Sequence, residues 1–306
     1  GLPKRTSRAL LDIEDQTTVP VIRDPQKVAA PDYDGDAVFY FPGCGSERLF
    51  SQVGLATQAM LYEIGAQTVL PPGYLCCGYP QIAAGESDLG QKITTDNRVL
   101  FHRVANTLNY LDINTVIVSC GTCMDQLQKY EFEKIFPGCR LLDIHEYLLE
   151  KGVKLGGVQG TRYMYHDPCH TPMKTMPGIK VANALMGQRV DLSDRCCGEA
   201  GTLAMGRPDI STQVRFRKQE EIEATASRLR NEGEMGANGN KVPFGGDIKI
   251  LTSCPSCLQG LSRYNGDAGT QADYIVVEMA RHLLGENWLA DYVDKANNGG
   301  IERVLL

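Results

Sequence analysis

The chain has 306 residues, of which 42% are hydrophobic and 22% charged, an ordinary globular composition that excludes a mainly disordered protein. Its net charge of −6 argues against a surface for nucleic acid or anionic lipid, because binding polyphosphate requires a basic face. Eleven cysteines are too dilute for a disulfide-stapled small domain and unusually many for an ordinary enzyme, so they point to metal binding.

The first elements along the chain are an arm, a strand and a helix. Residues 1–33 show no strong period and contain Pro20, Pro25 and Pro31, which predicts an arm or linker that docks elsewhere. The apolar run at residues 38–41 predicts a buried strand, and Cys44 follows it. Apolar residues then recur at spacings of three and four along residues 49–64, which predicts an amphipathic helix.

The same half continues with two further cysteine groups. The vicinal pair Cys76-Cys77 precedes Gly78, and residues 94–110 form a helical stretch. The β-branched run at residues 115–118 predicts a second buried strand, which leads into Ser-Cys-x-x-Cys. A short helix is predicted at residues 124–132, and residues 141–149 read as a strand that continues into a helix.

The second half of the chain repeats this order. Strands are predicted at residues 163–165 and 249–252, a helix at 258–264, and a strand that continues into a helix at 274–284, with a glycine-rich loop at 233–246. Corresponding cysteines are 120 to 134 residues apart, which indicates an internal duplication. The first copy comprises Cys44, Cys76, Cys77, Cys120 and Cys123, and the second comprises Cys169, Cys196, Cys197, Cys254 and Cys257.

Strands that alternate with helices predict an α/β fold with two pseudo-symmetric halves, each a mostly parallel sheet with flanking helices. We expect an arm at 1–33, a first repeat at 36–152, a second repeat at 160–290 and a tail at 291–306. Segments that follow parallel strands meet at the carboxyl edge of the sheet. The cysteine loops of each half are therefore expected to converge there.

Each half would offer five thiols to one site. A structural zinc ion and a cubane [4Fe–4S] cluster take four ligands each, so five thiols, two of them adjacent, fit neither neatly. Adjacent cysteines can cap neighbouring irons of a more open cluster, and the following glycine can donate its N–H to sulfur. Five thiolates also require a strongly positive core. We predict two iron–sulfur clusters, with zinc in one or both repeats as the alternative and Cys139 as a bystander.

The paired pattern resembles the cysteine-rich CCG domain family, on the segments Phe41-Pro-Gly-Cys44, His166-Asp-Pro-Cys169-His170 and Cys196-Cys197-Gly198. That family includes a cysteine-rich subunit of heterodisulfide reductase and the iron–sulfur subunits of glycolate, lactate and glycerol-3-phosphate dehydrogenases. The resemblance covers about residues 36–290 and implies that the ten paired cysteines hold noncubane [4Fe–4S] clusters. It also implies an oxidoreductase component. Such a module either reduces a disulfide bound between two clusters or relays electrons from a flavin that oxidises a 2-hydroxy acid.

Three other side chains next to the cysteines are candidates for catalytic roles. His166 and His170 bracket Cys169, and either could donate a hydrogen bond to the cluster or a proton to a substrate thiolate. Glu199 follows Cys197-Gly198 and could relay protons. The alternatives are structural: the histidines orient their loop, and Glu199 caps the helix that begins there.

Motifs for other cofactors are missing from the sequence. There is no G-x-G-x-x-G or Walker loop, so we expect no FAD or NAD in this chain, and the ferredoxin cysteine run is absent too. Electrons would come from a flavoprotein or a ferredoxin-type iron–sulfur protein or domain. They would pass to a small-molecule disulfide or a quinone-side acceptor. A zinc-stabilised, non-catalytic assembly domain is the alternative from another class.

The ends of the chain and its apolar runs bear on its context. Residues 1–6 lack the apolar segment of a signal peptide, and no apolar run approaches the ~20 residues of a membrane span. We expect a cytoplasmic protein, which a partner could hold at the inner membrane. The arm and the missing initiator Met suggest the carboxyl-terminal domain of a larger FAD-linked oxidase.

Overall fold

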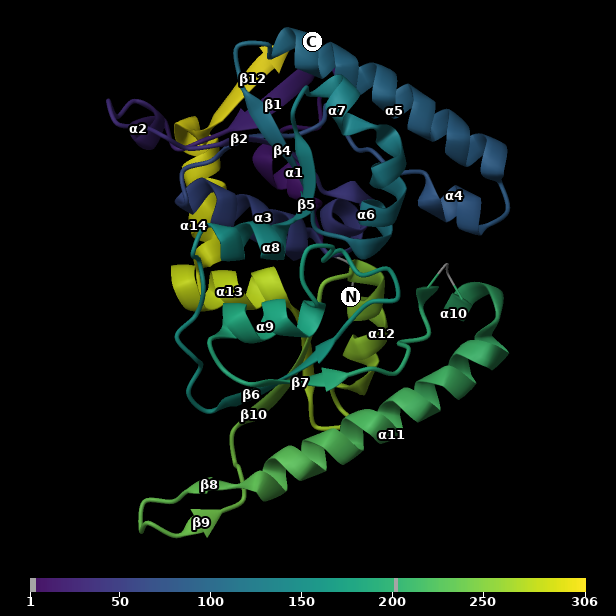
Figure 1. Ribbon diagram of the computed structural model, residues 1–306, viewed down its shortest axis with the longest axis vertical. Helices are drawn as coiled ribbons and strands as arrows, with labels where there is room; N and C mark the ends of the chain where they lie inside the picture. The colour runs from purple at the N-terminus through teal and green to yellow at the C-terminus, as the bar shows by residue number, and fades with distance from the viewer. Residues whose placement is uncertain (1–3, 201–202) are drawn as a thin grey trace.

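The computed structural model describes residues 4–200 and 203–306. Two sheets, one in each half of the chain, form its frame, and helices lie between them and on their outer faces (Figure 1). The first sheet has the order β12-β1-β3-β2-β4-β5, and the second has the order β11-β10-β6-β7.

The first half alternates strands and helices along the chain, because each buried apolar run is followed by an amphipathic one. Its π-helix, η1 (Gly45–Leu49), directly follows Cys44. The other elements are β2 (Ala37–Phe41), α3 (Ser51–Glu63), β3 (Gln67–Val69), α4 (Tyr79–Ala83), α5 (Ser87–Thr107), β4 (Ile113–Val118), α6 (Gly121–Leu127), α7 (Phe132–Ile135), β5 (Arg140–Asp143) and α8 (Ile144–Glu150).

The second half has the same plan with one insertion, a short hairpin at the end of its longest helix. The elements are β6 (Thr161–His166), α9 (Gly178–Met186), β7 (Val190–Ser193), α10 (Leu203–Gly206), α11 (Pro208–Glu232), the hairpin β8 (Glu234–Met235) and β9 (Lys241–Val242), β10 (Asp247–Thr252), α12 (Pro255–Leu261), β11 (Gln271–Tyr274) and α13 (Ile275–Leu284).

The duplication seen in the sequence is present in the topology. The order β3-β2-β4-β5 in the first sheet corresponds to β7-β6-β10-β11 in the second, and all of these neighbours pair in parallel. The predicted α/β fold with two mostly parallel sheets and flanking helices is therefore confirmed. The helices after each Cys-x-x-Cys begin three residues earlier than expected, at Gly121 and Pro255, because the first cysteine of each motif occupies the N-cap position.

The two ends of the chain meet on the first sheet. The N-terminal arm contains α1 (Ser7–Leu11), β1 (Thr18–Ile22) and α2 (Pro25–Val28), and the C-terminal segment contains α14 (Trp288–Lys295) and β12 (Ile301–Leu305). Strand β1 pairs antiparallel with β3 on one side and with β12 on the other. Both ends of the chain thus supply side strands, β12 and β1, to the first sheet, which is the sheet whose strands precede the first cysteine set.

A shared hydrophobic core joins the halves. Helices α3 and α8 of the first half lie against α13 and α9 of the second (Figure 1). Their buried faces include Leu61, Tyr147, Leu185 and Met279, which belong to one continuous apolar cluster. This packing fixes the carboxyl edges of the two sheets relative to each other.

Glu278 on α13 is a buried carboxylate in this layer. It accepts hydrogen bonds from Tyr163 Oη at 2.6 Å and Lys249 Nζ at 3.0 Å, and pairs with Arg281 at 2.6 Å. Although burial opposes it, the hydrogen bonds from Tyr163 and Lys249 keep the pKa of Glu278 below its usual value. The stability that Glu278 contributes is therefore present above its unfolded pKa and is lost as pH falls through its folded pKa.

We expect Glu278→Gln to lower the free energy of unfolding by about 1–3 kcal/mol at neutral pH, because buried donors lose a charged acceptor. The matched control is Glu286→Gln, whose side chain is 83% exposed and lies 3.8 Å from the same Arg281. Thermal unfolding should show a lower melting temperature for the first variant only, and the difference from the wild type should shrink in acid. Equal effects of the two variants would contradict the assignment.

Candidate metal centres at the carboxyl edges of the sheets

All ten paired cysteines follow the carboxyl ends of strands. Cys44 follows β2, the pair Cys76-Cys77 follows β3, and Cys120 and Cys123 stand at the start of α6 after β4. The second set occupies the corresponding positions after β6, β7 and β10. The two sheet edges face each other, so the structure brings both sets to one region between the halves.

The thiols form a nearly continuous series across that region. Cys120 of the first half and Cys254 of the second are close enough for each thiol to shift the pKa of the other, and both side chains are buried. Cys197 and Cys257 have their sulfurs 3.4 Å apart. Cys169 is exposed at the rim. Thiols that shift one another's pKa form a series in the order Cys44, Cys76, Cys77, Cys123, Cys120, Cys254, Cys257, Cys197, Cys196.

Charge is shared unevenly along the series. Hydrogen bonds from Cys44 and from its vicinal partner lower the pKa of Cys76 to about 3, while the bond to Cys76, together with burial, raises the pKa of Cys44. Hydrogen bonds from Cys196 and then Cys257 likewise lower the pKa of Cys197. Neighbouring sulfurs thus cannot all be ionised without a cation between them. Such a donor set fits a soft, polynuclear metal core, whose binding would release the remaining protons.

The backbone after each vicinal pair also points at sulfur. The amide of Gly78 donates to Cys76 Sγ at 3.5 Å, and the amide of Gly198 donates to Cys196 Sγ at 3.3 Å. Both glycines have positive φ, 94° and 79°, a conformation that other residues rarely adopt. The Cys-Cys-Gly sequence therefore supplies two thiols and a backbone donor at the same place in each half.

Two of the predicted non-cysteine candidates lie close to sulfur or to the opposite half. A ring nitrogen of His166 and the sulfurs of Cys197 and Cys257 all lie within 4.8 Å of one another, and all three side chains are buried. His170 Nδ1 lies 2.5 Å from Asp125 on α6, and its Nε2 lies 3.1 Å from the hydroxyl of Tyr79. The loop after Cys169 is thus attached to the first half of the chain.

The third candidate, Glu199, forms an ion pair with Arg263, and burial raises the pKa of its carboxyl. Cys139 lies outside the thiol series in the turn after α7, and burial raises its pKa to about 11. Sequence reasoning missed Asp125 as a partner of His170. These residues are 45 positions apart in different halves, and a single acidic residue two positions after a Cys-x-x-Cys motif gives no signal of that contact.

Gly121 explains why the two Cys-x-x-Cys motifs differ. A Cβ at this position would overlap the backbone oxygen of His170, so the second half leaves no room for a side chain. The second motif has Pro255 at the corresponding place, and its ring packs against Gly45, where a Cβ would lie 3.0 Å from Pro255 Cβ. The two halves therefore meet at two close contacts, which we call the junction. In one, Gly121 of the first half lies against the backbone of His170, and in the other, Pro255 of the second half lies against Gly45.

We expect Gly121→Ala to displace the loop that carries Cys169 and to destabilise the fold by about 1–3 kcal/mol, as overpacking does. Gly266→Ala is the control, because a Cβ there would meet none of the described atoms within 4 Å. Thermal unfolding and the metal content of the purified protein measure the effect. If Gly121→Ala has the same melting temperature and metal content as Gly266→Ala, the contact between Gly121 and His170 accommodates a side chain without loss of stability.

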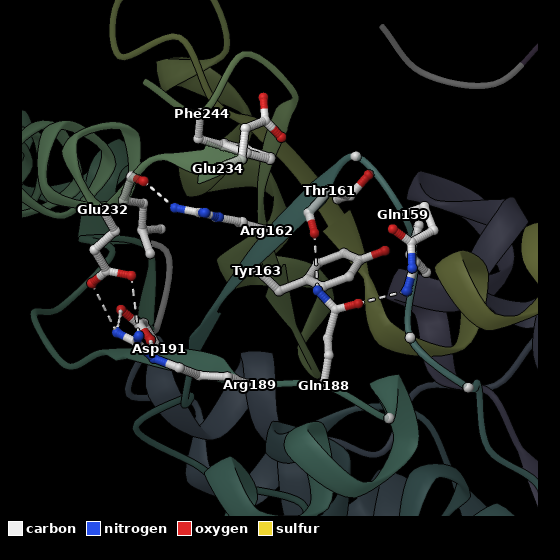
Figure 2. Close-up of a pocket in the computed structure, with 16 residues that line it drawn as sticks. Gln159, Thr161, Arg162, Tyr163, Gln188, Arg189, Asp191, Glu232, Glu234 and Phe244 are labelled. Atoms are coloured by element: carbon white, nitrogen blue, oxygen red, sulfur yellow. Dashed lines mark hydrogen bonds and ion pairs between the residues drawn. The ribbon is translucent and has the colours of Figure 1, made fainter. Parts of the chain in front are cut away.

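A cavity of about 540 Å³ lies at the opposite end of the second sheet, beside the first residues of β6 (Figure 2). The charged side chains that line it are paired with each other: Arg189 donates to Asp191 at 2.7 Å and to Glu232 at 3.1 Å. Arg162 donates to the backbone carbonyls of Leu229 and Gly233. The cavity is therefore separate from the thiol series, and we assign it no ligand.

Comparison with known proteins gives two family matches. The profile of the cysteine-rich domain CCG matches residues 38–128 and 163–262, which includes both cysteine sets. The profile of a domain of unknown function, DUF3400, matches residues 262–306. Among the described helices, none combines the length and apolar character that crossing a bilayer requires.

Relatives of known name are oxidoreductase and iron–sulfur proteins. An uncharacterized iron-sulfur protein of Methanococcus maripaludis is 26% identical over 79% of this chain and 45% of its own length. Lactate utilization protein A of Oceanobacillus iheyensis is 25% identical over 70% of this chain and 93% of its own length. A subunit of the dihydromethanophenazine:CoB–CoM heterodisulfide reductase of Methanosarcina acetivorans is 23% identical over 80% of this chain and 59% of its own length. The chain spans 35 to 45% of the length of three curated relatives that it matches.

Proposed function

The chain belongs to the cysteine-rich CCG domain family, and we propose that it is an iron–sulfur redox unit of an oxidoreductase of the heterodisulfide reductase or lactate-oxidising type. The observation that carries this proposal is the thiol series, which runs through both halves and crosses between them at Cys120 and Cys254. Two metal centres held by this series would be close enough for electrons to pass from one to the other.

We propose that each half holds one cluster through its five cysteines, as the duplicated topology suggests. Five thiols per half suit a noncubane [4Fe–4S] cluster better than a cubane, which takes four. When bound, such clusters supply one-electron redox chemistry. The chain itself holds the core, excludes water from Cys120 and Cys254, and directs the amides of Gly78 and Gly198 at sulfur.

The exposed rim favours a small-molecule disulfide as the electron acceptor. Cys169 is exposed, and Cys44, Cys76 and Cys196 are half-buried, so both sets reach the surface. Reduction of a disulfide R–S–S–R′ to two thiols takes two electrons and two protons. The electrons would come from a flavoprotein or ferredoxin-type partner, in two one-electron steps.

We propose positioning roles for His170 and Glu199. His170 holds the Cys169 loop on the first half through Asp125 and Tyr79, which itself follows Cys76-Cys77-Gly78. Glu199, bound to Arg263, anchors the segment that follows Cys196-Cys197-Gly198. The contacts of His170 would keep the two cysteine rims at a fixed separation, while the ion pair of Glu199 acts within the second half.

A second candidate function is the electron-transfer part of an FAD-linked 2-hydroxy-acid oxidase. It is favoured by lactate utilization protein A, 93% of whose length this chain covers. In that case the chain would pass electrons from a flavoprotein to a quinone-side acceptor.

Metal analysis of protein purified without oxygen tests the proposal. We expect iron and acid-labile sulfide of about eight each per chain, four per repeat. A colourless protein with about one zinc per repeat would instead support a structural domain. The reduced protein should then be mixed with a CoB–CoM heterodisulfide, with glutathione disulfide or with a soluble quinone. Reoxidation by a disulfide but not by the quinone favours disulfide reduction, and the reverse favours the relay.

A further inference from the structure

The two halves also differ at the last residue of the strand that precedes the first cysteine of each half. Phe41 is the last residue of β2 and His166 the last residue of β6, each three residues before the first cysteine of its half. The equivalence is fixed by the preceding tyrosines: Tyr40 hydrogen-bonds to Ser119 at 2.6 Å, and Tyr165 hydrogen-bonds to Ser253 at 2.9 Å. The duplicated frame therefore carries a benzene ring in one half and an imidazole in the other.

The surroundings of these two side chains are unlike. Phe41 is fully buried, and its ring centre lies 6.1 Å from that of Phe101. His166 is only 1% exposed, and one of its ring nitrogens lies within 4.8 Å of the sulfurs of Cys197 and Cys257. Within residues 4–200 and 203–306, neither of its ring nitrogens has a hydrogen-bond partner. A buried polar group without a partner is expensive, so the imidazole must be satisfied by something that occupies the thiol site.

We infer that His166 donates its ring N–H to thiolate sulfur of the second centre and thereby gives that centre a higher reduction potential than the first. This inference rests on the proposed function. Reduction adds negative charge to a cluster, and hydrogen bonds to its sulfurs stabilise that charge. Phe41 provides no such donor to the first centre, so electrons should collect at the second.

Other charged groups near the second centre do not have this role. The ammonium of Lys218 is buried and close enough to act on Cys197, but it donates to Ser193 Oγ at 2.6 Å and to Glu221 at 2.9 Å. Glu199 is engaged by Arg263. His166 is therefore the donor whose removal should change the second centre selectively.

The asymmetry gives the module a direction. Electrons would enter at the first centre, cross at the contact between Cys120 and Cys254, and leave from the second centre. The exposed thiol, Cys169, belongs to that second set. The acceptor is thus expected on the side of the second half.

Redox titration followed by electron paramagnetic resonance tests the inference on the loaded protein. His166→Phe copies the first half, and we expect it to lower the ratio of reduced to oxidised second centre about tenfold at a fixed potential, or ~59 mV for one electron. His166→Gln keeps an N–H donor and should move the ratio less. The reciprocal variant, Phe41→His, should raise the ratio at the first centre, and it decides the question if His166→Phe fails to fold.

The signals are assigned with Cys77→Ala and Cys197→Ala, each of which should leave one centre. Loaded protein in which His166→Phe leaves both potentials unchanged overturns the inference and leaves the proposed function standing. Strong nitrogen coupling typical of a directly bound imidazole would also overturn it, because His166 would then be a ligand. A wild-type protein without iron would remove the proposed function and the inference with it.

Discussion

Replacing Cys77 with alanine should remove the first iron–sulfur centre and leave the second, and replacing Cys197 should do the reverse. Cys77 lies between Cys76 and Cys123 in the first set, because both of these thiols shift its pKa, so its loss should divide that set in two. Cys197 has the same place in the second set, with its sulfur 3.4 Å from that of Cys257. Each single variant should retain about half of the iron and sulfide of the wild type, and the double variant almost none.

The matched control is Cys139→Ala, which removes a half-buried thiol outside the series and should leave the iron content unchanged. Counting spins by electron paramagnetic resonance would show which signal each variant lacks. If either single variant loses all of its iron, the ten cysteines hold one shared core that spans Cys120 and Cys254. If neither variant loses iron, the vicinal pairs are not ligands.

Local sequence was sufficient to predict the frame of each half. Predicted strands precede four of the six cysteine groups, which placed these groups at the carboxyl edge of a parallel sheet. The orders β3-β2-β4-β5 and β7-β6-β10-β11 have that arrangement, and they add β3 and β7, the short strands before the vicinal pairs. These features could be predicted because the spacing of apolar residues and the positions of the cysteines are both visible within short stretches of the sequence. The division of the paired cysteines into two sets of five was therefore a prediction that needed no knowledge of the packing.

Contacts between the halves had no such local signal. The strand β1 contains Pro20, which argues against a strand, and it pairs with β12 at the other end of the chain. The pairing of His170 with Asp125, and the clash that reserves position 121 for glycine, depend on how α3 and α8 pack against α13 and α9. The same packing brings Cys120 to Cys254, so the most informative contact of the site was also the least predictable.

Replacing Arg8 with methionine should destabilise the protein by about 3–5 kcal/mol, because it leaves the carboxylate of Glu47 buried without its counter-ion. Arg8 on α1 and Glu47 on η1 are each 1% exposed, and Arg8 Nε lies 2.5 Å from Glu47 Oε1. Because η1 begins directly after Cys44, the first centre should also lose iron more readily. The control is Arg5→Met on the exposed part of the same arm.

The pH dependence identifies Glu47 as the cause. Burial, partly offset by Arg8, raises the pKa of Glu47 from 4.5 to about 7. Between these values the folded state holds more protons than the unfolded state, so this group makes stability fall as pH rises towards 7. In Arg8→Met the fall should extend to higher pH, because the counter-ion no longer favours the carboxylate.

The double variant Arg8→Met/Glu47→Gln should recover most of the lost stability, since replacing both partners of a buried ion pair is often close to neutral. Melting temperatures would be measured at pH 6, 7 and 8. For Arg8→Met, we expect the melting temperature to fall steeply as pH rises. For the double variant, we expect its difference in melting temperature from Arg5→Met to be nearly the same at all three pH values. A double variant that remains as unstable as Arg8→Met would mean that the arginine contributes through packing of α1 on η1. The charge of Glu47 would then have little part in holding the arm beside Cys44.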